Sequence, residues 1–162
     1  MAPRTHLRTV AALAVLLLVA SVAGCSSSPG ELTLSDARIE VPANPKVAAA
    51  YLTIRNDTGS DEVLESVTSP DAAVTIHRSA QDDAGRSMMT EQAEVKISNG
   101  ETLSFEPGEL HLMLNSLERK LEVGDHVELT FQFKNAGEVV ADADVIEAGT
   151  ALDGVKENDH EH

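Results

Sequence analysis

The sequence predicts an all-β domain, either a Greek-key β-sandwich or a small β-barrel. Apolar residues alternate over short stretches with almost no helical periodicity, and turn-forming residues interrupt them about every ten positions. Many short strands with regular breaks are typical of these two architectures. The core is expected to be mainly aliphatic, because the only aromatic residues are one tyrosine and three phenylalanines.

The N-terminal stretch is set apart from the fold. Arg4 and Arg8 precede the uninterrupted apolar run Val10–Ala20. A run of about 11 residues is too short to cross a bilayer, which takes roughly 20, but it suits the apolar region of a secretory signal. Residues 1–24 are therefore predicted to be a signal peptide.

The end of this signal resembles a bacterial lipobox. The small residues of Val22-Ala23-Gly24 lead directly to Cys25, and cleavage there would leave Cys25 as a lipidated N-terminus. The alternative is an ordinary signal peptide with a bystander cysteine. Residues 25–31, which include three serines and Pro29-Gly30, are predicted to be a flexible tether. The expected location is extracytoplasmic, at the cell membrane.

Within the predicted domain, residues 32–150, each strand is expected where apolar residues recur at every second position. Turns are expected at the Asn-, Asp-, Pro- and Gly-rich breaks between them. In chain order, the alternating sets are Leu32/Leu34, Leu52/Ile54, Val63 with Val67, Val74/Ile76, Val95/Ile97, Leu103/Phe105, Leu110/Leu112/Leu114, Val127/Leu129/Phe131/Phe133 and Val139/Ala141/Ala143/Val145. The intervening turns are Asn56–Gly59, Asn99-Gly100, Pro107-Gly108, Gly124-Asp125 and Asn135–Gly137.

Composition excludes several classes of partner. Cleavage before Cys25 would leave 138 residues, enough for one domain with its own core. Residues 1–24 hold two of the 12 basic residues and none of the 27 acidic ones, so the mature part has a formal charge of −17. This charge argues against nucleic acid and against electrostatic docking on anionic lipid, which leaves the lipid anchor as the contact with the membrane. Cys25 is the single cysteine, so no disulfide framework is possible.

One predicted strand carries unusual residues on the face that turns away from its leucines. His111 and Met113 alternate with the leucine set, so they lie side by side on one face. The same arrangement places His77 opposite Val74 and Ile76 in an earlier strand. Met88 and Met89 follow the polar, turn-like segment Gln81–Ser87 that leaves this earlier strand.

Imidazole and thioether donors together point to a particular metal ion. Thioether sulfur is a soft, neutral ligand that suits Cu(I) rather than Ca²⁺ or Mg²⁺, and imidazole also binds copper. Zinc or iron would require cysteines or carboxylates at ligand spacing, and no such set is evident in the sequence. The sequence therefore predicts a Cu(I) site.

The spacing of these residues resembles the copper-binding pattern of the PCuA(C) family of periplasmic copper chaperones. Further family landmarks are Ala48–Asn56, Gly85, Pro107–Leu117 and Leu121–Asp125. The resemblance implies a cupredoxin-like fold and delivery of copper to a recipient protein, either a cytochrome oxidase subunit with its dinuclear copper site or an assembly factor. It also implies four Cu(I) ligands: His77, Met89, His111 and Met113.

The chain departs from the family pattern at three positions. Arg78 and Ser87 stand where many members have methionine, and Glu109 stands where glycine is frequent. Met88 is a possible auxiliary ligand. Adjacent residues of an extended segment point in opposite directions, however, so Met88 and Met89 should not both bind the metal.

Other interpretations stay open at this point. His160 and His162 lie in the acidic tail, residues 151–162, and could bind a harder ion such as Cu(II), although a disordered acidic end is the simpler interpretation. A blue-copper protein would need a cysteine ligand within the fold. No motif of an enzyme is present, so no catalytic residue is predicted. The alternative function is a metal-free β-sandwich lipoprotein used in adhesion or another interaction.

Overall fold

The computed structural model describes residues 30–81 and 85–149. The predicted signal peptide, residues 25–29 of the tether and the tail lie outside the described residues, and so do Cys25, His160 and His162. Across the two described ranges, no helix is long and apolar enough to cross a membrane.

The domain is built from β-strands, which confirms the predicted all-β fold class. The ten strands found in the described residues are β1 (Leu32–Glu40), β2 (Val47–Asn56), β3 (Glu62–Thr68), β4 (Ala73–Gln81), β5 (Ser87–Glu91), β6 (Val95–Ile97), β7 (Thr102–Phe105), β8 (Leu110–Asn115), β9 (His126–Phe133) and β10 (Gly137–Ile146). Nine of them contain the alternating sets that the sequence predicts.

The strands form one curled, mixed sheet in the order β5-β4-β8-β2-β1-β10-β9-β3-β6, and β7 pairs with β2 beside β8. Only β1 and β10 run parallel; the other pairs are antiparallel. Strands β3 and β4 are consecutive in the chain and lie close together, but they share no ladder beyond the bridge between Ser69 and Ala72. Because the sheet is curled, β3 and β4, which are far apart in the strand order, lie beside each other at the turn that connects them.

The core lies inside the curl and is mainly aliphatic, as predicted. Its largest members include Phe105, Phe131 and Phe133, which are fully buried. One predicted pair is wrong: Leu64, rather than Val63, shares the core with Val67. The pairing of β3 with β9 shifts register between Leu64 and Ser66, and this irregularity resets the alternation within the strand.

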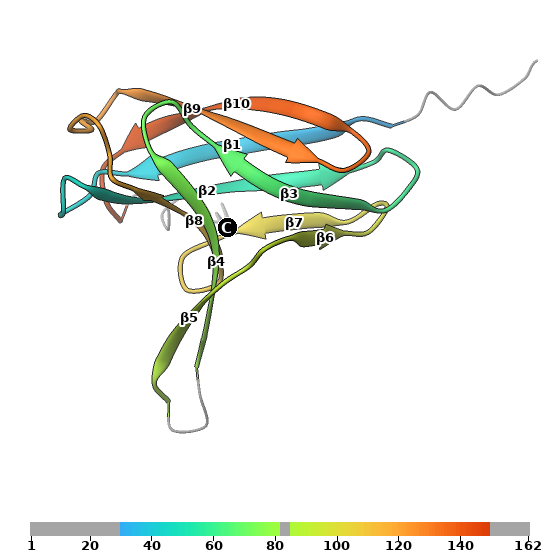
Figure 1. Ribbon diagram of the computed structural model, residues 1–162, viewed down its shortest axis with the longest axis horizontal. Coiled ribbons are helices and arrows are strands. Elements are labelled where there is room, and N and C mark those ends of the chain that lie inside the picture. The colour runs from blue at the N-terminus through green and yellow to red at the C-terminus, as the bar shows by residue number, and fades with distance from the viewer. Residues whose placement is uncertain (1–29, 82–84, 150–162) are drawn as a thin grey trace, which may run out of the picture.

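Strand β5 was not expected from the sequence, which indicated a loop followed by two methionines. All five of its residues are exposed, so it has no alternation of buried and exposed positions. It forms through pairing with β4 and occupies the edge of the sheet. Figure 1 shows that the hairpin of β4 and β5 extends away from the rest of the sheet.

Candidate metal centre

Pairing of β4 with β8 brings the two predicted histidines together. His77 lies directly opposite His111, and Thr75 lies opposite Met113. Residues that face each other across an antiparallel pair share one face of the sheet, as do residues two apart along a strand. These four side chains therefore lie on the same face.

Strand β5 extends this face on the other side of β4. Met89 lies opposite Ser79, and Glu91 lies opposite His77. Met89 is therefore a diagonal neighbour of His77, within reach of a long side chain, whereas Met88 belongs to the opposite face. We call this surface the histidine–methionine face; it carries His77, Met89, His111 and Met113.

His111 is one of three buried polar or charged residues in the described part of the chain. The other two hold neighbouring loops in place: Asn56 donates to the Ser60 carbonyl, and Glu62 accepts from the Asn135 amide. His111 is only 5% exposed, and its Nδ1 lies 3.0 Å from the carbonyl oxygen of Glu109. A carbonyl can only accept, so Nδ1 carries the hydrogen and the neutral ring has its lone pair on Nε2.

The ring of His77 is held by its neighbour on the same face. Its Nε2 lies 2.9 Å from the hydroxyl oxygen of Thr75. This oxygen also accepts a hydrogen bond from the side-chain amide of Asn115 at 3.3 Å. The Nδ1 atom of His77 is buried and has no hydrogen-bond partner among the described residues. A buried polar atom without a partner is costly, so this nitrogen is a position where a ligand would be favourable.

The two rings are close enough to share one metal ion. Their centroids are 6.0 Å apart, and their planes are inclined by 34°. Because metal–nitrogen bonds are about 2 Å long, two imidazoles on one ion can have centroids up to roughly 6.3 Å apart. The observed separation is within this limit.

Exposure changes sharply across the histidine–methionine face. His111 is buried, His77 and Met113 are half-buried, and Met89 is 56% exposed. His111 lies on the face of β8 that turns away from the leucines, as predicted, but this face is also covered, since β8 is buried on both faces around this residue. Met89, on β5, is therefore the most exposed of the four residues.

Two further residues belong to this face, and the sequence interpretation gave them no role. Thr75 positions the ring of His77, and Glu91 adds a carboxylate opposite the same histidine. The signal for Thr75 was its position two residues before His77 in one strand. Glu91 lies two residues after Met89, but this spacing carries information only once β5 is known to be a strand.

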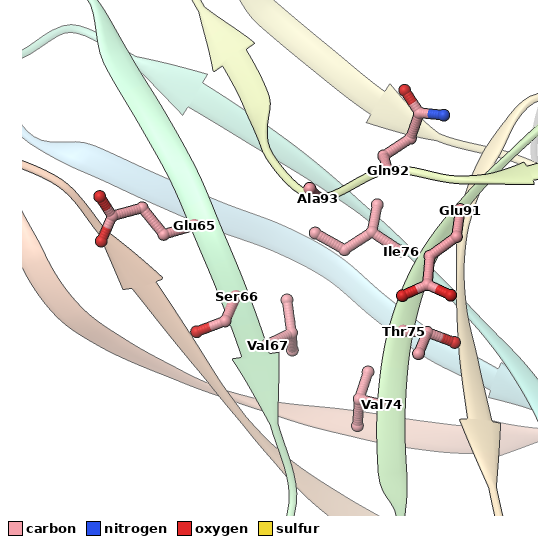
Figure 2. Close-up of a pocket in the computed structure, with 9 residues that line it drawn as sticks. All are labelled: Glu65, Ser66, Val67, Val74, Thr75, Ile76, Glu91, Gln92 and Ala93. Carbon is pink, nitrogen blue, oxygen red and sulfur yellow. The ribbon is translucent and has the colours of Figure 1, made fainter.

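A pocket of about 150 Å³ borders this site, between β3 and β4. Figure 2 shows Val67 and Val74 directed toward each other across the gap between the two strands. Thr75 and Glu91 line the same pocket, which therefore adjoins the histidine–methionine face. Within residues 30–81 and 85–149, no group of three or more His, Cys, Asp or Glu side chains is placed to hold a metal ion.

Comparison of the sequence with known families gives a match over most of the domain. The model of a family described as "Putative lipoprotein LpqE-like" matches residues 32–145. The chain is also similar to "Putative lipoprotein Lxx21020" of Leifsonia xyli subsp. xyli (strain CTCB07), with 24% identity over 140 residues, covering 79% of this chain and 84% of the relative.

Comparison with solved structures shows the same fold in copper-related domains. The apo PCuAC domain from PmoF1 has a TM-score of 0.62 and 28% identity, over 73% of this chain and 95% of that domain. The solution structure of CuI-DR1885 from Deinococcus radiodurans has a TM-score of 0.61 and 23% identity, over 77% of this chain and 85% of that protein. The cupredoxin-like fold and the resemblance to PCuA(C) proteins predicted from the sequence are confirmed.

Proposed function

The chain belongs to the LpqE-like lipoprotein family, and from this premise we propose that it is a lipid-anchored, extracytoplasmic copper chaperone. It binds one Cu(I) ion through His77, Met89, His111 and Met113 and passes the ion to a recipient protein. The observation that carries this proposal is the direct pairing of the two histidines across β4 and β8, with methionines as their neighbours on the same face.

The donors on this face fit Cu(I) in chemistry. Neutral imidazole nitrogen and thioether sulfur are the ligand types that copper accepts and that hard ions reject. Hydrogen bonds to Glu109 and Thr75 orient the two rings, as partners of metal-bound histidines commonly do. The buried Nδ1 of His77, which has no hydrogen-bond partner in the described part of the chain, would gain a partner when the ion binds.

The distribution of exposure suits transfer by ligand exchange. A donor protein must hold the ion and still let incoming ligands reach it. The histidine pair is the sheltered part of the site, whereas Met89 on the edge strand is open to solvent. Incoming ligands would therefore replace Met89 first and the histidines last.

The lipoprotein family supports the proposed location, and the resemblance to PCuA(C) chaperones supports the proposed partner. Export and lipidation at Cys25 would hold the domain at the outer side of the cell membrane. The recipient we propose is a cytochrome oxidase subunit with its dinuclear copper site, or a factor that assembles it. This part of the proposal rests on the resemblance of the chain to PCuA(C) chaperones.

X-ray absorption of the Cu(I)-loaded protein tests the ligand set. We expect one copper per chain, low coordination number and mixed nitrogen and sulfur scattering. A shell of oxygen alone would contradict the site. If mass spectrometry finds no copper retained after the protein has been incubated with Cu(I), the alternative function, a metal-free interaction lipoprotein, is favoured instead.

A further inference from the structure

Strand β5 has one edge that no strand of the described residues covers. The sheet order places β5 at its end, with β4 as its single neighbour. The backbone groups on the outer edge can be identified from the hydrogen bonds on the inner edge, because opposite pairs of an antiparallel ladder alternate between bonded and non-bonded types.

The alternation assigns the outward-pointing backbone groups to three residues of β5, one of which is Met89. The backbone amide of Gln92 donates to the Ile76 carbonyl at 2.8 Å, and these two residues continue the register of β4 with β5. The next opposite pair, His77 with Glu91, is therefore of the non-bonded type, and so is Ser79 with Met89. The amide and carbonyl of Met89 consequently point to the outer edge, together with those of Ser87 and Glu91.

This edge has little of the usual protection against pairing with another chain: Glu91, at its end, is the one charged residue of this short strand. Exposed edge strands commonly carry proline, lysine or a bulge that prevents strand addition. Strand β5 has the sequence Ser-Met-Met-Thr-Glu, and its register with β4 is regular. Both of its methionines are more than half exposed.

We propose that the outer edge of β5 is the docking site of the copper recipient, which adds an extended segment to the sheet as a further strand. This inference rests on the proposed function. The added strand would bond to the backbone of Ser87, Met89 and Glu91. If the added strand is antiparallel to β5, its residue opposite Met89 lies on the histidine–methionine face, about 5.5 Å from Met89 between Cα atoms.

The ligands on the histidine–methionine face determine which side chains the docked segment must carry. A side chain that takes over Cu(I) beside Met89 must itself be a soft ligand, which means methionine, histidine or cysteine. Alternate positions of the added strand face the ion, so these ligands should recur at every second residue. The chain carries 27 acidic residues against 12 basic ones, which disfavours an acidic segment.

The test uses a capped peptide of alternating threonine and methionine as the probe, titrated into the ¹⁵N-labelled protein with and without Cu(I). We expect the largest amide shifts at Ser87, Met89 and Glu91, and transfer of Cu(I) to the peptide. Ser87→Pro removes one outward amide hydrogen and no bond to β4, so it should weaken peptide binding about three- to tenfold. Ser87→Ala keeps this hydrogen and is the matched control.

Equal peptide binding by the two Ser87 variants would overturn the proposal, as would shifts confined to another surface. Pairing of two copies through β5 would also overturn it; ultracentrifugation would then show a dimer that Ser87→Pro dissociates. Docking is read from amide shifts without copper, and Cu(I) affinity is measured separately. Loss of copper binding with intact docking therefore counts against the proposed function, and the reverse result counts against the docking site.

Discussion

The histidine–methionine face has two parts that differ in how they are held. On the β4–β8 ladder, His77 and His111 are paired across the strands, and hydrogen bonds fix both rings. On β5, Met89 is more than half exposed on an edge strand with no buried residue. One part is preorganised by the core beneath it, whereas the other is an exposed strand held by its backbone pairing with β4.

This difference suits a carrier. Ligands that are already oriented lose little conformational freedom when they bind, which favours retention of the ion. A ligand at an exposed edge can be displaced without disturbing the core. The residues of β4 and β8 should therefore dominate the stability of the protein and its affinity for Cu(I). The residues of β5 should control how easily incoming ligands reach the ion.

The largest expected contrast is in the stability of the metal-free protein. Leu112 is fully buried between the two site residues of β8, and Leu112→Ala should lower the free energy of unfolding by about 2–5 kcal/mol. Met89→Ala should change it by less than about 0.5 kcal/mol, since the residue is exposed. Urea denaturation measures both. Similar losses in the two variants would show that β5 is as firmly packed as β8.

Removing the two proposed ligands of β8 should have the next largest effect. The double variant His111→Ala/Met113→Ala should weaken Cu(I) binding by at least about 100-fold, more than is usual for residues that only orient ligands. Competition with a Cu(I) chelator provides the measurement. His126→Ala, at an exposed histidine that pairs with Asp144, is the control and should leave affinity unchanged. Unaltered affinity in the double variant would refute the ligand assignment.

The two adjacent methionines of β5 test which face binds copper. Met89→Leu removes sulfur from the histidine–methionine face, so we expect about a tenfold loss of Cu(I) affinity. Met88→Leu makes the same chemical change on the opposite face and should have no effect. A larger loss from Met88→Leu would mean that the register of β5 with β4 differs from the one described.

The smallest effect is expected from the residue that orients His77. Thr75→Val preserves shape but removes the hydroxyl, so Cu(I) affinity should fall three- to tenfold, at about the lower limit for such positions. Thr130→Val, at a half-buried threonine of β9, is the matched control. The sulfur and nitrogen scattering of the Thr75→Val protein should stay unchanged, because Thr75 acts through His77. Loss of a nitrogen ligand from this spectrum would indicate that the ring has left the site.

Local periodicity was sufficient to predict most strands, because a half-buried strand must alternate apolar and polar residues. It failed at two places. Strand β5 has no buried side, so nothing in its side chains distinguishes it from a loop. At β3, the irregularity after Leu64 changes which residues face the core, and one strand considered alone cannot reveal a partner's register.

By itself, the sequence determined the all-β class and the aliphatic core, because these depend on composition and on spacing within single strands. It also singled out the candidate donors, through the placement of histidines and methionines and through the resemblance to PCuA(C) chaperones. Only the tertiary structure decided that His77 faces His111, that Met89 rather than Met88 shares their face, and that Glu91 joins them. These relations depend on the register between strands far apart in the chain. Burial of His111 has the same origin, since it requires packing on both faces of β8.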